Sequence, residues 1–308
     1  MTLVLAVVMV GCGADSADPK KGTESGSQKT ASFPVEIKDT SGQIVTIEKE
    51  PKRIVSIIPG MTEVAFALGI GDRVVGVTEN DNYPEEVEKI EKVGDMTINT
   101  EKVLALKPDL VLASPLNGEA VEQLRKLGLT VLSFDGQNLD EVYELIRRVG
   151  KATGTEDEAE KVISQMEDEK KAVLEKVDSL SDKEKPKVWI EVSPELYTAG
   201  KGTFMDELVT LAGGYNVAGE QEGWPQVSAE KVVDWNPDVI ILMYGHDNQK
   251  KSVDQVSARK GWQNIEAVKT GQIIPLETDM LSRPGPRLTE GLQKVAEAIH
   301  PDLMKKGE

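Results

Sequence analysis

Residues 156–180 read EDEAEKVISQMEDEKKAVLEKVDSL, and this stretch contains neither glycine nor proline. Its apolar residues recur at mostly helical spacing among glutamates and lysines, as Val162, Met166, Val173 and Val177 do. The pattern predicts one long helix of about 25 residues, since nothing within the stretch would stop a helix. Because most of its surface is polar, we expect this helix to connect two folded bodies rather than to lie in a core.

Short apolar runs alternate with helical patterns on both sides of the long helix. Before it we expect a hairpin at 35–47 and strands at 53–58, 74–78, 110–113 and 131–134, with helices at 62–68, 100–106, 121–127 and 139–150. After it we expect strands at 188–192, 239–243 and 273–276, with helices at 203–212, 229–235, 262–265 and 287–299. Such alternation is typical of βαβ units and parallel sheets. The sequence therefore predicts an α/β protein with an N-terminal lobe at 34–155, a connecting helix at 156–183 and a C-terminal lobe at 184–308.

An internal repeat supports two equivalent lobes. Residues 99–103 read NTEKV and are followed by Pro-Asp at 108–109, while residues 228–232 read SAEKV and are followed by Pro-Asp at 237–238. The interval from glutamate to proline is seven positions in both segments. The match indicates one helix-turn-strand unit used twice, and chance similarity of two α/β segments is the alternative. Two equivalent lobes with a cleft between them suit a protein that captures a small molecule.

The composition excludes some partners. The chain has 308 residues, 39% of them hydrophobic and 29% charged, which suits a globular protein with room for two cores. Its formal net charge is −17 and its isoelectric point is near 4.7. A site for nucleic acid needs a basic surface that neutralises phosphates, so we expect no nucleic acid as a partner. The same acidity argues against electrostatic docking on anionic lipid.

The N-terminus has the features of an export signal. Residues 3–10 form an apolar run that is too short to span a bilayer, which needs roughly 20 residues. The run ends at Cys12, the single cysteine of the chain, and residues 9–12 (MVGC) resemble a lipobox with methionine in the usual leucine position. We expect a signal peptide at 1–12 with Cys12 as the lipid-bearing residue; an ordinary buried cysteine is the alternative. The polar stretch 13–33 then reads as a disordered tether that anchors an extracytoplasmic protein to the outer face of the cell membrane.

The sequence offers little for enzymatic chemistry. It contains no Gly-x-Ser-x-Gly motif. Residues 198–203 (TAGKGT) resemble a phosphate-binding loop only in part, because the upstream glycine is missing and Gly202 stands where Ser or Thr follows the lysine. With only two histidines, His246 and His300, a site of three histidine ligands cannot form. We therefore expect no catalytic residues, no metal site and no cofactor.

Three residues suggest ligand recognition instead. Trp224 lies between a glycine and a proline, in a loop where an exposed aromatic ring suits ligand contact better than simple packing, which is the alternative. Arg283 follows a predicted strand, and Asp279 precedes it by four positions. Open α/β sheets bind ligands beyond the carboxyl ends of their strands, so this pair is a candidate ligand contact. Alternatively, the pair staples its own loop.

Several segments together resemble the periplasmic binding proteins for cobalamin, ferric siderophores and heme. The likeness covers about 35–301 and rests on RIVS at 53–56, Pro59, Thr62-Glu63, LKPDLV at 106–111, GKGTFMDEL at 200–208 and AGGYN at 212–216. The resemblance implies two Rossmann-like lobes joined by one rigid helix, with a ligand cleft between the lobes and modest closure. It also implies the monomeric solute-binding component of an ABC importer, which delivers its ligand to a permease dimer.

In this family one acidic residue near the tip of each lobe pairs with arginines of the permease. The matching positions here are Glu101 and Glu230, the glutamates that the internal repeat equates. One carboxylate on each lobe suits a two-fold symmetric partner. The alternative is two solvated glutamates that the positive ends of their helices favour.

The resemblance also implies which residues contact the ligand. In the second lobe, Trp224, Asp279 and Arg283 stand where cobalamin binders contact the corrin ring and its amides, so a corrinoid is the expected ligand. In the first lobe the candidates are Pro59, Asn80 and Met96, where Asn80 replaces a tyrosine and Met96 lies in a stretch that carries tryptophan in the cobalamin binders.

Other ligands and functions stay open. Met96 and His246 form the kind of pair that ligates heme iron, and Arg283 with Tyr83 would suit a ferric siderophore. An extracytoplasmic enzyme or a lipid-anchored sensor on the same scaffold are more distant alternatives.

Overall fold

The computed structural model describes residues 32–245 and 248–305. In the N-terminal part, β1 (Val35–Lys38) and β2 (Ile44–Ile47) form an antiparallel hairpin with Val35 opposite Ile47. A five-stranded sheet follows in the order β5-β4-β3-β6-β7, and all its pairings are parallel. Its strands are β3 (Ile54–Ser56), β4 (Val74–Val77), β5 (Glu91–Lys92), β6 (Leu110–Ala113) and β7 (Val131–Ser133).

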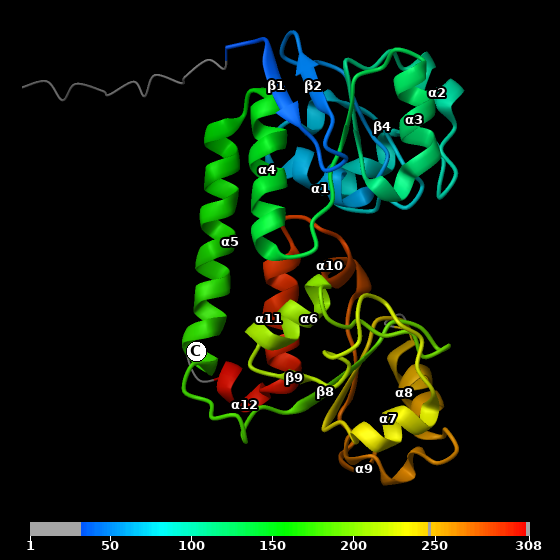
Figure 1. Cartoon of the computed structure of the whole chain (residues 1–308), viewed down its shortest axis with the longest axis vertical. Coiled ribbons are helices and arrows are strands. Elements are labelled where there is room, and N and C mark those ends of the chain that lie inside the picture. Colours follow the sequence, from blue (N-terminus) through cyan, green and yellow to red (C-terminus); the bar gives the residue numbers. More distant parts are fainter. Residues whose placement is uncertain (1–31, 246–247, 306–308) are drawn as a thin grey trace, which may run out of the picture. The chain divides into compact units, whose positions relative to one another are not determined.

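The helices of this lobe connect and cover the sheet (Figure 1). They are α1 (Pro59–Ala67), α2 (Thr100–Ala105), α3 (Gly118–Lys126) and α4 (Leu139–Thr153), with short 3₁₀ turns η1 (Gly71–Arg73), η2 (Glu85–Lys89) and η3 (Pro115–Asn117). Helix α1 begins at Pro59, three residues before the predicted start at Thr62. Proline suits a first helical position because its missing N–H would have no partner there. Thr62 is instead buried inside the helix.

The long helix is α5 (Glu156–Val177), which ends a few residues earlier than the sequence suggested. It follows α4 after Gly154, whose left-handed conformation (φ 74°) ends α4. A Cβ atom on Gly150 would lie 2.7 Å from Cβ of Ala159, so this glycine lets α4 and α5 approach closely. In Figure 1, α5 runs beside α4 at one end and beside α11 (Leu288–Ile299) at the other.

The C-terminal lobe contains a four-stranded parallel sheet in the order β11-β10-β8-β9. Its strands are β8 (Lys187–Glu191), β9 (Tyr215–Asn216), β10 (Val239–Leu242) and β11 (Ile273–Pro275). Besides α11, its helical elements are α6 (Phe204–Leu211), α7 (Ala229–Trp235), α8 (Gln249–Ser257), η5 (Trp262–Asn264), α9 (Glu266–Thr270), α10 (Thr278–Ser282) and α12 (Pro301–Met304). Two Rossmann-like lobes joined by one long helix are thus confirmed.

The largest buried cluster of apolar side chains continues from one lobe to the other. It includes Leu132 of β7, Met166 of α5, Ile190 of β8 and Leu292 of α11. Two smaller clusters lie within single lobes, one around Val111 and one around Trp189, Trp262 and their neighbours. Because α5 contributes to the shared cluster, it is packed against both lobes and is not merely an exposed connector.

Candidate functional site

The predicted ligand residues follow the strands of both sheets. Since the strands of each sheet are parallel, the carboxyl ends of one sheet lie together at one edge, where open α/β sheets bind ligands. Pro59, Asn80 and Met96 follow strands of the N-terminal sheet, and Trp224, Asp279 and Arg283 follow strands of the C-terminal sheet. The sequence suggested a loop for Asp279 and Arg283, whereas Asp279 belongs to the short helix α10 and Arg283 is its C-cap residue.

The two edges meet at Arg283. Its guanidinium donates through Nη1 to Oδ1 of Asn82 at 2.8 Å and through Nη2 to the backbone carbonyl of Asn80 at 3.1 Å. Nη2 also pairs with Oδ2 of Asp279 at 2.9 Å. The structure therefore brings Asp279, Arg283 and the backbone of Asn80 together across the two lobes. The sequence did not single out Asn82, because a polar residue in an exposed loop carries no distinguishing pattern.

A buried carboxylate on α1 extends this contact. Glu63 is 3% exposed and binds Arg287 through two hydrogen bonds, from Nε at 2.8 Å and from Nη2 at 2.7 Å. Arg283 donates to the same carboxylate at 3.0 Å. Burial lowers the pKa of Arg287, but the hydrogen bonds and charge of Glu63 outweigh it and raise the pKa, so the arginine stays charged. Two arginines of one lobe thus hold one glutamate of the other.

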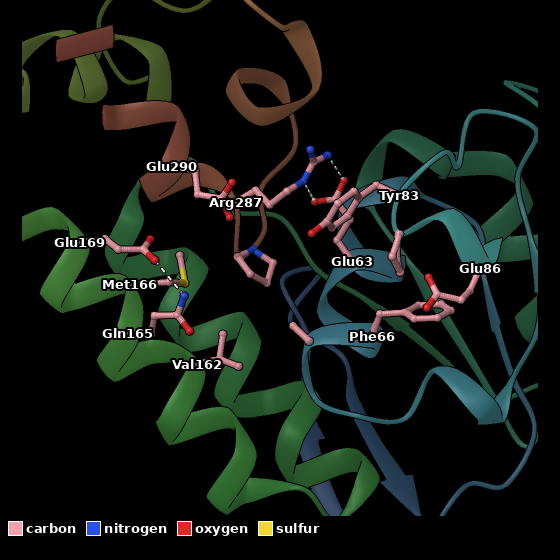
Figure 2. A pocket seen from close by; sticks show the side chains of 13 residues that line it. Glu63, Phe66, Tyr83, Glu86, Val162, Gln165, Met166, Glu169, Arg287 and Glu290 are labelled. Atoms are coloured by element: carbon pink, nitrogen blue, oxygen red, sulfur yellow. Dashed lines mark hydrogen bonds and ion pairs between the residues drawn. The ribbon is translucent and has the colours of Figure 1, made fainter. Parts of the chain in front are cut away.

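Two cavities border this ion cluster. A cavity of about 90 Å³ lies between Pro59 and Phe134 of one lobe and Arg283 and Pro284 of the other. A larger one of about 420 Å³ is lined by Glu63, Arg287 and residues of α5, and Figure 2 shows Arg287 reaching Glu63 beside the ring of Tyr83. The guanidinium of Arg287 lies 4.0 Å from the centre of that ring, a cation–π contact.

The lobes lie close together at Gly60. A Cβ atom on this residue would lie 2.8 Å from the backbone oxygen of Pro284, which real side chains do not tolerate. The absence of a side chain at position 60 therefore permits the contact between α1 and the segment after α10.

Trp224 lies in a loop of the C-terminal lobe that is hydrogen-bonded to a neighbouring segment. Its ring is 43% exposed and meets Phe204 edge-on at 5.7 Å between ring centres. Backbone hydrogen bonds from Thr198 to Pro225 at 2.9 Å and from Gly200 to Gly223 at 2.8 Å hold the loop. Tyr197, also 43% exposed, belongs to the paired segment and was not predicted. Two exposed aromatic rings on paired loops favour contact with an apolar ligand.

Two apolar side chains of the N-terminal lobe are more exposed still. Met96 is 88% exposed in a turn closed by a bridge between Gly94 and Ile98, and Leu116 is 85% exposed in η3 after β6. Both follow strands of the five-stranded sheet, as ligand-contacting residues of such sheets do. Exposed apolar residues in this position suggest contact with a large apolar ligand.

A buried polar network lies at the carboxyl ends of β8 and β10. Arg259 binds the fully buried Glu191 through two hydrogen bonds of 2.6 Å, and the hydroxyl of Tyr244 donates to the same carboxylate. Burial, followed by the hydrogen bond and charge of Glu191, raises the pKa of Tyr244. The hydroxyl therefore stays protonated and donates to Glu191. This network could not be predicted from the sequence, because its members are far apart in the chain.

The repeat that contains Glu101 and Glu230 forms two equivalent structures. Both glutamates are exposed in the first turns of α2 and α7, whose N-caps are the side chains of Asn99 and Ser228. Hydrogen bonds from its own backbone N–H and from the hydroxyl of Ser228 lower the pKa of Glu230, which keeps this carboxylate charged.

Some predicted features lie outside the described residues, namely Cys12 with the signal peptide and His246. Among residues 32–245 and 248–305, no group of three or more His, Cys, Asp or Glu side chains is arranged to hold a metal ion. In the same ranges, no helix is both long and apolar enough to cross a membrane.

Comparison with known proteins identifies the fold. The model of the periplasmic binding protein family matches residues 54–280. An uncharacterized ABC transporter substrate-binding lipoprotein of Bacillus subtilis, YvrC, is 45% identical over 313 residues, 99% of this chain and 96% of the relative. A cobalamin-binding protein of Halobacterium salinarum is 30% identical over 307 residues, 97% of this chain and 83% of that one.

A solved structure points to the same family. The periplasmic heme-binding protein RhuT of Roseiflexus sp. RS-1 superimposes with a TM-score of 0.73 at 28% identity, covering 82% of this chain and 99% of that one. Family membership confirms the resemblance drawn from the sequence motifs. The chain belongs to the periplasmic binding protein family, whose members bind small solutes and work with ABC transporter permeases.

Proposed function

We propose that this chain is the extracytoplasmic solute-binding lipoprotein of an ABC importer and that its solute is a corrinoid such as cobalamin. The observation that carries the choice of ligand is the Asp279–Arg283 pair, whose charged groups lie 2.9 Å apart where the lobes meet. A carboxylate accepts hydrogen bonds and a guanidinium donates them, so the two together suit a neutral amide. The corrin ring carries several such amides at its periphery.

The exposed apolar side chains support the same ligand. The rings of Trp224 and Tyr197 on one lobe and the side chains of Met96 and Leu116 on the other can pack on the face of a large macrocycle. The 30% identity to a cobalamin-binding protein over nearly the whole chain agrees with this choice.

Heme or a ferric siderophore is the second candidate. The exposed sulfur of Met96 could ligate heme iron, and the similar protein RhuT is named for heme. However, the propionates of heme would meet the negative charge of Asp279 as well as the positive charge of Arg283, which weakens their binding. Arg283 and Tyr83 remain the candidate contacts for a siderophore.

Delivery of the ligand would use one glutamate on each lobe. Glu101 and Glu230 are exposed at equivalent helix starts, and we assign them to docking on arginines of a permease dimer. The protein would act as a monomer, tethered to the membrane through lipid on Cys12, as the lipoprotein name of YvrC supports.

Tryptophan fluorescence tests the proposed ligand. The chain is titrated with cyanocobalamin, hemin and a panel of ferric siderophores, and the signal is corrected for light absorbed by these coloured compounds. Saturable quenching by cyanocobalamin at micromolar or lower concentration, largely lost in Trp224→Ala, is expected. Saturation by hemin or a ferric siderophore without any response to cyanocobalamin would retain the importer function and replace the corrinoid by an iron compound.

A further inference from the structure

The side chain of Asn82 links the two lobes. This residue follows β4, and its Nδ2 donates to Oδ2 of Asp279 at 2.8 Å while its Oδ1 accepts from Nη1 of Arg283 at 2.8 Å. The two partners lie 197 and 201 positions later in the chain. The side-chain amide of Asn82 therefore hydrogen-bonds to both Asp279 and Arg283, the two residues that we propose as ligand contacts.

The chemistry of the partners determines the orientation of this amide. A carboxylate can only accept and a guanidinium can only donate, so the amide nitrogen faces Asp279 and the oxygen faces Arg283. A primary amide of a ligand would need the same orientation to bind the same two groups. Asn82 and such a ligand are therefore direct competitors for one pair of hydrogen-bonding partners.

We infer that Asn82 determines affinity and specificity: its side-chain amide occupies the Asp279–Arg283 pair, and the ligand binds by substituting a primary amide of its own. This inference rests on the proposed function, because it takes Asp279 and Arg283 as ligand contacts. It assigns to Asn82 the role of an internal substitute for the ligand.

The surroundings allow Asn82 to leave while Arg283 stays in position. Arg283 keeps its hydrogen bonds to Glu63 at 3.0 Å and to the backbone of Asn80 at 3.1 Å, and its side chain is only 12% exposed. Asn82 lies in an exposed loop and has water as an alternative partner. The exchange therefore gives up hydrogen bonds of an exposed side chain and leaves the buried ion pair intact.

The same geometry selects against acids. If a carboxylate replaced the amide, one of its oxygens would face Oδ2 of Asp279, and the two negative charges would repel each other. The pair should therefore prefer a macrocycle with primary amides to the same macrocycle in which an amide has been hydrolysed to the acid.

Titration of the full chain and its Asn82→Ala variant with cyanocobalamin tests the inference. Because the variant has no amide to displace, its dissociation constant should be about three- to ten-fold lower than that of the wild type. Asn264→Ala, which removes an exposed amide from η5, is the matched control and should bind like the wild type. Thermal unfolding of both variants verifies that they are folded.

The ligand side supplies a second measurement, with monocarboxylic derivatives of cyanocobalamin in which one amide is replaced by an acid. At least one of them should bind the wild type about ten-fold or more weakly than cyanocobalamin. Equal or weaker binding of cyanocobalamin by Asn82→Ala would overturn the inference while the proposed function stands. Lack of saturable cyanocobalamin binding by wild type and variant alike would remove the proposed function, and the inference with it.

Discussion

At the scale of single residues, Glu63 shows what local sequence can and cannot reveal. A glutamate within the apolar run of α1 is unusual, yet its partners Arg283 and Arg287 lie 220 and 224 positions later. No local pattern connects residues so far apart. Trp224, Asp279 and Arg283, in contrast, could be proposed as ligand contacts from the sequence, because each lies beside a predicted strand end or a turn signal. In the structure they follow strands of the C-terminal sheet.

Replacing Glu63 by glutamine should lower the free energy of unfolding by about 3 kcal/mol, because the buried charge of Arg287 would lose its close carboxylate and keep the ring of Tyr83 and one distant, exposed carboxylate. That carboxylate belongs to Glu277, 38% exposed and 3.9 Å from Arg287. Urea denaturation measures the change. Glu277→Gln is the control and should change stability by less than about 0.5 kcal/mol. A loss in Glu63→Gln no larger than in this control would show that the ion cluster does not hold the lobes.

At the scale of elements, the repeated segments fold alike in detail. Each ends its helix with a left-handed residue before the proline, Lys107 with φ 47° and Asn236 with φ 46°. The aspartates that follow bind equivalent backbone groups. Asp109 accepts from the N–H groups of Lys52 at 2.9 Å and Arg53 at 3.1 Å, and Asp238 accepts from Lys187 at 2.8 Å.

These aspartates make a graded prediction about stability. Asp109→Ala should lower the free energy of unfolding by about 1–2 kcal/mol, and Asp238→Ala by about 1 kcal/mol, since the first loses two hydrogen bonds and the second loses one. Chemical denaturation of both variants gives the values. Asp234→Ala, an exposed change on α7, serves as the control and should have little effect. The reverse order of the two losses would contradict the account of the repeat.

Elements with a clear apolar pattern could be predicted, and those without one could not. The strands and the long helix follow from apolar runs and from the absence of helix-breaking residues. Two helices could not be predicted: α8, in which only Ser252 and Val256 are buried, and α10, which has five residues and buries only Leu281. Strand β9 was missed because two residues carry no periodicity.

At the scale of the whole molecule, the continuous apolar core and the ion cluster join the lobes, while Glu101 and Glu230, which we propose for docking, lie on separate lobes. A partner that contacts both glutamates would therefore depend on the distance between the lobes. Because the proposed ligand contacts and the proposed docking glutamates are different residues, we expect that a mutation can abolish permease docking without changing ligand affinity.

The double variant Glu101→Gln, Glu230→Gln should bind its ligand with unchanged affinity and lose permease binding by about 100-fold or more, because each of the two charge pairs at such an interface contributes about 1.5 kcal/mol or more. Each single variant should lose less than the double variant. Binding to the permease in lipid nanodiscs measures the effect, with Glu119→Gln in the first turn of α3 as the matched control. Wild-type docking by the double variant would refute the assigned role.

The most direct test of the account is equilibrium dialysis of the full chain against cyanocobalamin, hemin and ferric siderophores, each at several concentrations. We expect one molecule of cyanocobalamin bound per chain with a dissociation constant in the micromolar range or below, and markedly weaker binding of the iron compounds. Tight binding of hemin or a ferric siderophore together with no retention of cyanocobalamin would contradict the proposed ligand.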